Sequence, residues 1–257
     1  MRNRMFSVLL LSAALVALCE FRVKPVAARS PSKKLLYVTM AAGYKHDSLP
    51  VSREVVKQIG EKSGLFESTD VSDVSDLTAD NLRNYDAVMF YTSGELPLSE
   101  IQKSAFADYI NAGHGFVGVH SAADSCYMWD KYLRIAGGFF DGHPWHQNVT
   151  IDVAAPDNKL VKFLGKSFQI NDEIYQIRDF QWRDSTVILR LDPNTVDLTK
   201  PGVNKRFYNW PLAWTRKYGR GKIFYTALGH EQAVWQDPRF QELLLNGIKW
   251  SMGEMKE

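Results

Sequence analysis

The sequence predicts an α/β fold, a three-layer, flavodoxin-like sandwich with a mostly parallel central sheet and an antiparallel extension. In the first half of the chain, short apolar runs typical of buried strands alternate with segments of helical periodicity. This alternation is the pattern of right-handed βαβ units on a parallel sheet. It stops after Gly138, and residues 139–220 hold shorter strands and loops, which indicates the antiparallel part.

The first strand is predicted at Lys34–Thr39, an apolar run that leads into a polar loop containing His46. Pro50 lies where a helix can begin, because proline is tolerated in the first helical turn. We expect this helix to end at Gly60. Its apolar positions recur at helical spacing: Val51, Val55, Val56 and Ile59.

A second strand is predicted at Asp86–Tyr91, and Ser93 follows it. Ser99 is the expected N-cap of the next helix, and Gly113 is its expected end. One apolar stripe of that helix should pack on the sheet: Ile101, Ala105, Phe106, Tyr109 and Ile110.

The central segment is Phe116–Val119, a short apolar run between glycines that predicts a buried strand. A polar turn follows, and a helix is expected to start near Cys126. A strand that ends in a sharp turn before a helix lifts one side chain above the sheet edge, which is the geometry of a nucleophile elbow. Here that side chain is His120.

The last strand is predicted at Gly221–Ala227, and the final helix has apolar residues from Phe240 to Trp250. In open α/β sheets, ligands bind at the carboxyl ends of the parallel strands. Four polar side chains lie just past such ends: His46, Ser93, His120 and His230.

Residues 1–28 have the pattern of a secretory signal peptide. Two arginines precede an apolar run from Phe6 to Leu18, and residues 26–28 are small enough for cleavage. We therefore expect one domain at residues 29–257 and a periplasmic or secreted protein. Lipidation of Cys19 is the alternative that the sequence leaves open.

Charge and cysteine content restrict the mature chain further. The first 28 residues carry four of the 31 basic and one of the 29 acidic residues, so their removal shifts the net charge from +2 to −1. That balance gives no electrostatic reason to bind nucleic acid or an anionic membrane, and we predict neither partner. Cys126 is the one cysteine that remains, which excludes an intrachain disulfide.

His120 and His230 are the strongest candidates for catalysis, because each follows a strand where the fold exposes it to the ligand. His46 lies in a loop at the same edge and is expected to bind substrate. His114, between two glycines at a helix end, fits a solvated capping role.

Glu173 is the predicted catalytic carboxylate. In an extended segment Asp172 and Glu173 point to opposite sides, so one of them faces the cleft. His143 and His146 have a common metal-ligand spacing, but Pro144 between them argues against a regular helix, and we expect both to bind substrate. Since no fixed zinc motif is present, we assign no metal ligands and leave open a divalent metal such as zinc.

A serine hydrolase is not expected. Ser121 follows His120, but the sequence misses the Gly-x-Ser-x-Gly pattern by one position. Histidine serves readily as an acid, a base or a ligand. We therefore assign Ser121 to substrate contact and not to acyl-enzyme chemistry.

Residues 34–252 resemble a ThuA-like (trehalose utilisation) domain, which has a class I glutamine amidotransferase-like fold. The resemblance covers nearly all of the mature chain, and its segments are specific as a set. They are Gly118–Ala122, Gly142–His143, Asp172–Tyr175, Pro211–Trp214 and Gly221–His230.

In the amidotransferases the elbow carries a cysteine, and a histidine and a glutamate follow the last strand. By this resemblance His120 takes the cysteine position and His230 the histidine position, whereas Glu231, adjacent to His230, departs from the usual offset. Cys126 lies too far along the chain to replace the missing cysteine. The resemblance therefore implies no glutamine hydrolysis, and it implies metabolism of trehalose, keto-disaccharides or keto-glycosides.

Tryptophan fits a sugar ligand, because flat aromatic faces stack on sugar C–H faces. We expect Trp145 and Trp214 to contact the substrate. Three hypotheses remain open. The first is acid–base catalysis on a small carbohydrate by His120, His230 and Glu173, and the second is a non-catalytic sugar-binding module. The third is a metal-dependent hydrolase or lyase, in which Zn²⁺ or a similar ion is held by residues among His120, His143, His146, Glu173 and His230. A homo-oligomer is also left open.

Overall fold

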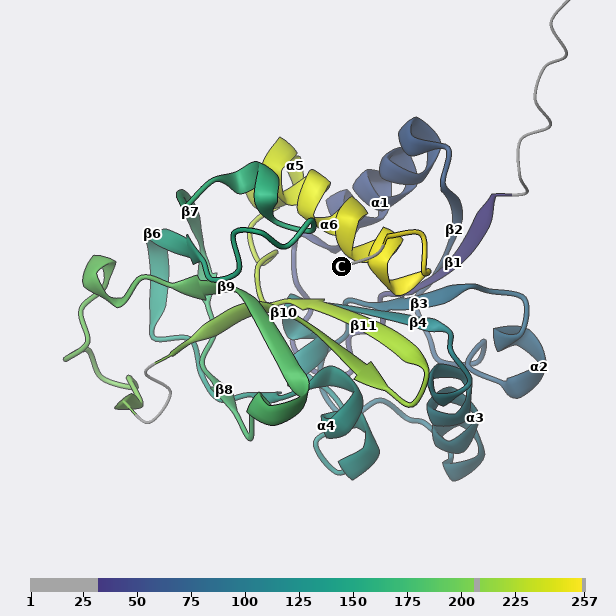
Figure 1. The fold of residues 1–257 in the computed structure, drawn as a ribbon. Helices are drawn as coiled ribbons and strands as arrows, with labels where there is room; N and C mark the ends of the chain where they lie inside the picture. The colour runs from purple at the N-terminus through teal and green to yellow at the C-terminus, as the bar shows by residue number, and fades with distance from the viewer. Residues whose placement is uncertain (1–31, 206–208, 256–257) are drawn as a thin grey trace, which may run out of the picture. The chain divides into compact units, whose positions relative to one another are not determined.

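The computed structural model describes residues 32–205 and 209–255, and the predicted signal peptide lies outside them. The α/β architecture is confirmed as a nine-stranded mixed sheet in the order β2-β1-β3-β4-β11-β10-β9-β6-β7 (Figure 1). The parallel strands are β1 (Lys33–Val38), β2 (Phe66–Val71), β3 (Ala87–Phe90), β4 (Gly115–Val119) and β11 (Gly221–Thr226). The antiparallel extension consists of β6 (Trp145–Val153), β7 (Ser167–Ile174), β9 (Ser185–Leu191) and β10 (Pro211–Tyr218).

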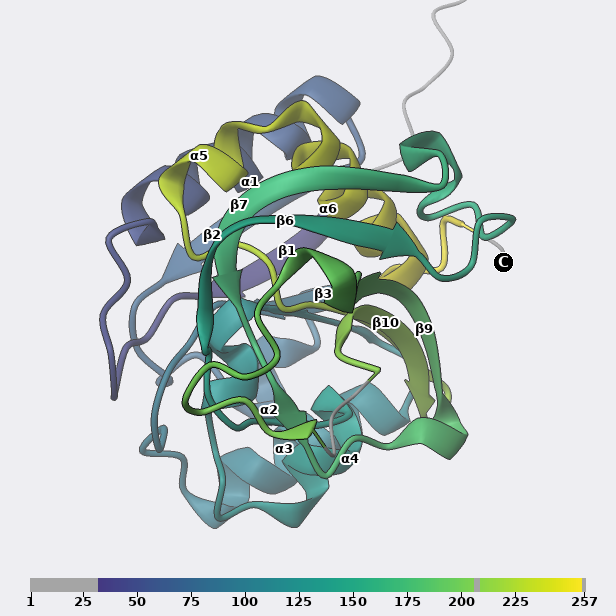
Figure 2. The ribbon, with the colours of Figure 1, turned by 90° about the vertical axis from the view of Figure 1, so that its left-hand side faces the viewer.

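Helices cover both faces of the sheet, which gives the three layers (Figures 1 and 2). One face carries α1 (Leu49–Ser63), α5 (Gln232–Gln236) and α6 (Pro238–Ser251), and the other carries α2 (Ala79–Leu82), α3 (Glu100–Asn111) and α4 (Asp130–Ala136). A small second sheet pairs β5 (Phe139–Phe140) with β8 (Ile177–Arg178). Short 3-10 helices occupy His120–Asp124 (η1), Lys162–Leu164 (η2), Trp182–Asp184 (η3) and Pro193–Thr195 (η4). No helix in the described part of the chain is both long and apolar enough to span a bilayer.

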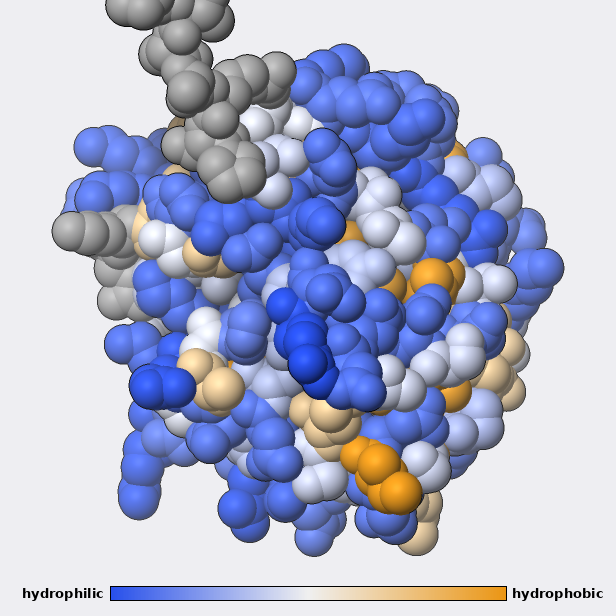
Figure 3. Space-filling model, turned by 90° about the vertical axis from the view of Figure 1, so that its right-hand side faces the viewer, coloured by the Kyte–Doolittle hydropathy of each residue, from blue (hydrophilic) through white to orange (hydrophobic). Residues whose placement is uncertain are grey.

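The inner parallel strands β3 and β4 are buried along their whole length, which explains their continuous apolar sequences. Strand β2 was not predicted, because its residues are mostly polar and only Phe66 is buried. It is an edge strand, and polar side chains on an edge oppose pairing with another chain. The face on this side of the molecule is largely hydrophilic, with separate apolar residues (Figure 3).

Helix α1 continues through Gly60, so the predicted end at that residue was wrong. The helix ends at Ser63, and Gly64 follows in the left-handed conformation. A Cβ at Gly60 would lie 2.5 Å from the carbonyl oxygen of Phe66. Gly60 is therefore required for the close approach of α1 to β2, and it does not stop the helix.

Helix α3 begins with the predicted cap, because Ser99 and Gln102 form a reciprocal capping box. Gly113 follows the helix with φ +117°, as expected of its end. The predicted apolar stripe is only partly correct. Phe106, Tyr109 and Ile110 are buried, whereas Ile101 is 82% exposed because it lies in the first turn.

The Ser99→Ala substitution should lower the free energy of unfolding by about 0.5–2 kcal/mol, because it removes the hydroxyl that accepts from the backbone N–H of Gln102. Urea denaturation of the two proteins would measure the difference. Ser104→Ala on the exposed side of α3 is the matched control and should change stability much less. Equal effects of the two substitutions would contradict the capping role.

Candidate functional site

His120 lies directly after β4, in a backbone conformation that non-glycine residues rarely adopt, with φ +45°. The hydroxyl of Tyr225 donates to the carbonyl oxygen of His120 and accepts from the backbone N–H of Ala123 at 3.0 Å. These two bonds hold the turn in place. Backbone strain of this kind is typical of functional sites, and it gives His120 the elbow position.

The ring of His120 is fully buried, and its protonation pattern follows from one hydrogen bond. Its Nδ1 lies 2.7 Å from the carbonyl oxygen of Ala227. A carbonyl oxygen only accepts hydrogen bonds, so Nδ1 carries the hydrogen of the neutral ring. The other nitrogen, Nε2, therefore presents its lone pair to the site.

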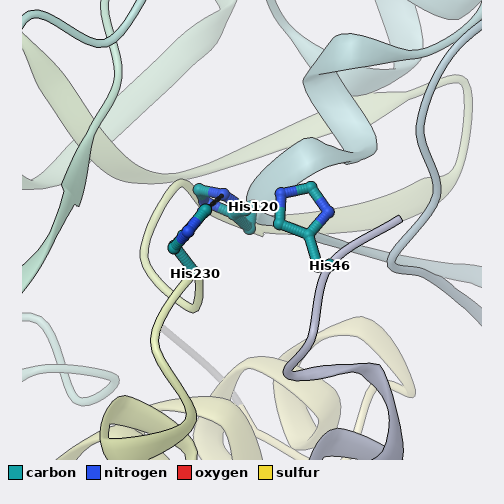
Figure 4. A group of neighbouring side chains, drawn as sticks. All are labelled: His46, His120 and His230. Atoms are coloured by element: carbon teal, nitrogen blue, oxygen red, sulfur yellow. Dashed lines mark hydrogen bonds between the residues drawn. The ribbon is translucent and has the colours of Figure 1, made fainter. Parts of the chain in front are cut away.

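Three polar atoms converge at this point. His120 Nε2 lies 3.3 Å from His230 Nδ1 and 3.7 Å from Glu173 Oε1, and His230 Nδ1 lies 3.5 Å from the same carboxylate oxygen. Figure 4 shows His120 and His230 facing each other, with His46 beside them. His120 follows the end of β4, Glu173 lies near the end of β7, and His230 lies in the loop after β11.

His46 completes the cluster from the loop between β1 and α1. Its ring centroid lies 4.9 Å from that of His120 and 5.1 Å from that of His230. One ring nitrogen of each of these histidines lies within 4.8 Å of those of the other two, so the group could hold a metal ion. A second such group consists of His146, Glu173 and His230.

A cleft of about 470 Å³ opens above the cluster. Its walls combine aromatic, imidazole and carboxylate side chains, and none of the described lining residues is Lys or Arg. The lining residues are Tyr44, His46, Asp124, Phe140, His143, His146, Glu173, Tyr175 and His230. The volume is in the range of small-molecule sites.

Asp172 and Glu173 face opposite sides of β7, and Glu173 is the one that lines the cleft. Asp172 is fully buried and accepts from the backbone N–H groups of Gly229 at 2.7 Å and Glu231 at 3.1 Å. These bonds fix the loop on both sides of His230. Asp172 therefore positions His230 and is not among the residues that line the cleft.

Burial dominates the electrostatics of the site. It lowers the pKa of His46 to about 4 and that of His120 well below its usual value, and it also lowers the pKa of His230. Burial raises the pKa of the Glu173 and Asp172 carboxyls to about 7 each. The three imidazoles are therefore neutral near pH 7, with lone pairs available to a proton or a cation.

His143 and His146 are the half-exposed members of the site. Nδ1 of His143 lies 3.3 Å from Glu173 Oε2, and Nε2 of His146 lies 2.5 Å from Glu231 Oε1. Their side chains are 49% and 47% exposed. Both can therefore meet a substrate and solvent directly, whereas His120 is fully buried.

A family model described as "Trehalose utilisation" (ThuA) matches residues 34–251. The chain belongs to the ThuA family. Among curated proteins, none matches this chain.

Solved structures place this ThuA-family protein among similar folds. A ThuA-like protein from Bacteroides uniformis is 22% identical, with a TM-score of 0.70 over 87% of this chain and 93% of that chain. A ThuA-like protein from Parabacteroides merdae is 23% identical, with a TM-score of 0.70 over 88% and 93%. A protein from Thermoplasma acidophilum, described as one of the subunits of GMP synthase, is 12% identical, with a TM-score of 0.52 over 86% and 96%. The amidotransferase-like fold is thereby shown.

Three predicted substrate-binding residues of this ThuA-family chain do not reach the cleft. Trp145 and Trp214 are fully buried, with their indole N–H groups donated to the carbonyl oxygens of Asp197 and Ala136. Ser121 is buried in η1. These three residues were predicted to bind a sugar because of their aromatic rings or hydroxyl group. However, β6 and β10 place the two tryptophans in the core, and η1 places Ser121 there.

The cleft also contains residues that sequence reasoning missed, namely Tyr44, Asp124, Phe140 and Tyr175. Tyr44 lies two residues before His46, and Tyr175 lies two residues after Glu173. Alternate residues of an extended segment share a face, so this spacing could have indicated that both tyrosines face the cleft. Tyr44 is 62% exposed and offers a flat face to a ligand.

Cys126 does not replace the amidotransferase cysteine, since it is 2% exposed and burial raises the pKa of its thiol to about 12. We expect native protein to resist alkylation by iodoacetamide at pH 8, because the thiolate is the reactive form. Protein unfolded in guanidinium chloride should take up one label in the residue 32–257 part of the chain, measured by mass spectrometry. Rapid labelling of the native protein would contradict this assignment.

Proposed function

We propose that this protein is an enzyme acting on an uncharged small carbohydrate that carries a carbonyl group, such as a keto-disaccharide or keto-glycoside. His120, His230 and Glu173 form its catalytic centre. The observation that carries the proposal is the convergence of their three polar atoms, 3.3–3.7 Å apart, beneath the cleft. The family description, trehalose utilisation, supports a carbohydrate as the substrate class.

The charge of the cleft supports a neutral sugar. Asp124 and Glu173 are among its lining residues, and the described lining residues include no Lys or Arg. A sugar phosphate is usually held by cationic side chains, which pair with the phosphate oxygens. An uncharged hydroxylated ligand needs only hydrogen bonds and aromatic faces such as that of Tyr44.

The chemistry follows from the carbonyl group. A carbonyl acidifies the neighbouring C–H bond, so isomerisation or elimination needs a group that takes this proton and one that stabilises the charged oxygen. The half-exposed His143 and His146 can exchange the proton. The buried centre can stabilise the oxygen by a hydrogen bond donated from His230 or from protonated Glu173, or through a bound cation.

The absence of a cysteine at the elbow argues against glutamine hydrolysis, although the amidotransferase-like fold is shared. The signal-peptide pattern of residues 1–28 supports a periplasmic or secreted enzyme as part of the proposal.

The test compares a keto-disaccharide with its unoxidised parent sugar and follows product by chromatography. We expect turnover of the keto form only, and loss of turnover in His120→Ala with a far-UV spectrum like that of the wild type. Unchanged turnover in His120→Ala would remove the proposed centre. Sugar binding by calorimetry without any product would favour a non-catalytic sugar-binding module instead.

A further inference from the structure

We propose that His120 Nε2, His230 Nδ1 and Glu173 Oε1 bind a divalent cation, best matched by Zn²⁺, with a fourth coordination position open to the cleft. The inference rests on the proposed catalytic centre and states what occupies it. Each of these three ligand atoms lies within 3.7 Å of the other two, beside the cleft.

The spacing of the three atoms carries the proposal. They form a triangle with edges of 3.3, 3.5 and 3.7 Å. A tetrahedral ion with bonds of about 2.0–2.1 Å separates its ligand atoms by about 3.3–3.4 Å. Octahedral coordination with the same bond lengths requires about 2.8–3.0 Å between neighbouring ligands, which is shorter than each edge. The triangle therefore matches one face of a tetrahedral site.

The partners of the ligands fit the same role. Metal-bound histidines usually donate their other ring N–H to a carbonyl or carboxylate, which fixes the ring. Nδ1 of His120 does this toward the carbonyl oxygen of Ala227 at 2.7 Å. The second carboxylate oxygen of Glu173 lies 3.3 Å from His143 Nδ1, which orients the carboxylate. His120 and Glu173 are thus held before a cation arrives.

The charge of the surroundings also calls for a cation. Glu173 is buried, and Asp124 lines the same cleft. The described residues that line the cleft supply no Lys or Arg to balance these two carboxyls. Buried carboxylates in proteins are paired or coordinate metals. A divalent ion would provide that balance at the point where the ligand atoms meet.

His46 lies beside the triangle (Figure 4). One of its ring nitrogens lies within 4.8 Å of ring nitrogens of both His120 and His230, so His46 is a further potential ligand next to the same ion. Three protein ligands and one open position are typical of catalytic zinc. The ion would polarise a sugar carbonyl oxygen in that position, while His143 and His146 move the proton.

The test measures metal content without reference to activity. The mature chain is stripped with a chelator, dialysed against ZnCl₂ and then against metal-free buffer, and analysed by mass spectrometry for metals. We expect one Zn²⁺ per chain in the wild type, and at least a tenfold loss of affinity in His230→Ala and Glu173→Gln. His114→Ala, a half-buried histidine stacked on Tyr109 away from the cleft, is the matched control and should keep one ion.

Substitution by Co²⁺ measures the coordination geometry of the bound ion, because tetrahedral cobalt absorbs visible light far more strongly than octahedral cobalt. Failure of the wild type to retain an ion, or retention unchanged in both ligand variants, overturns the inference. Keto-sugar turnover by the stripped protein would leave the proposed function standing and refute the cation. A bound ion without turnover of any keto-sugar would support the cation site and refute the proposed function.

Discussion

The Glu173→Gln substitution should lower the turnover of a keto-sugar by about two to three orders of magnitude, the range lost when a group that stabilises charge in the transition state is removed. Glu173 lies within 3.3–3.7 Å of three imidazoles, those of His120, His143 and His230. Glutamine keeps the shape of the side chain but carries neither a negative charge nor a transferable proton. The centre would lose the one group that all three histidines share.

Glu242→Gln is the matched control, because Glu242 lies exposed on α6. It makes the same chemical change on the surface and should leave turnover unchanged. Steady-state kinetics and thermal unfolding of both variants separate a catalytic effect from a folding defect. Turnover within threefold of the wild type in a folded Glu173→Gln protein would contradict the assignment.

The proximity of His46, His120 and His230 could be predicted from the sequence because the topology of the sheet determines it. His46, His120 and His230 each follow a parallel strand, and the carboxyl ends of such strands share one edge of the sheet. No knowledge of side-chain contacts is needed for that step. The apolar run of β4 between glycines, followed by a polar turn before a helix, also indicated the elbow, because a strand that ends in such a turn raises one side chain above the sheet edge.

The approach of Glu173 and His146 could not be predicted in the same way. They are direct partners in the antiparallel pairing of β7 with β6, and that register depends on how the whole extension packs. A shift by one residue would send His146 to the opposite face. The long-range pairing of β6, β7, β9 and β10 leaves little local pattern, so the sequence indicated strands there without their partners.

The resemblance to amidotransferases concerns the elbow position after β4. In this chain His120 occupies that position with φ +45°. A cysteine in that position attacks a carbonyl carbon, whereas a neutral histidine with a fixed Nδ1–H offers a lone pair. The same edge of the sheet can thereby change from acyl transfer to the binding of a proton or a cation.

The Trp214→Ala substitution should lower the free energy of unfolding by about 3–5 kcal/mol, the usual loss for a fully buried tryptophan. Trp214 stacks on Tyr225 with ring centroids 4.2 Å apart and donates to the carbonyl oxygen of Ala136 at 2.8 Å. Tyr225 in turn holds the His120 turn, so loss of the stack should also reduce turnover. Trp214→Phe keeps an aromatic ring against Tyr225 and removes the donor, and it should cost only about 1–3 kcal/mol. If Trp214 contacted the sugar, Trp214→Phe would raise KM at unchanged stability.

Denaturant unfolding and KM, measured on the same two variants, therefore distinguish a core tryptophan from a sugar-binding one. The buried position of Trp214 predicts lower stability and unchanged KM for Trp214→Phe.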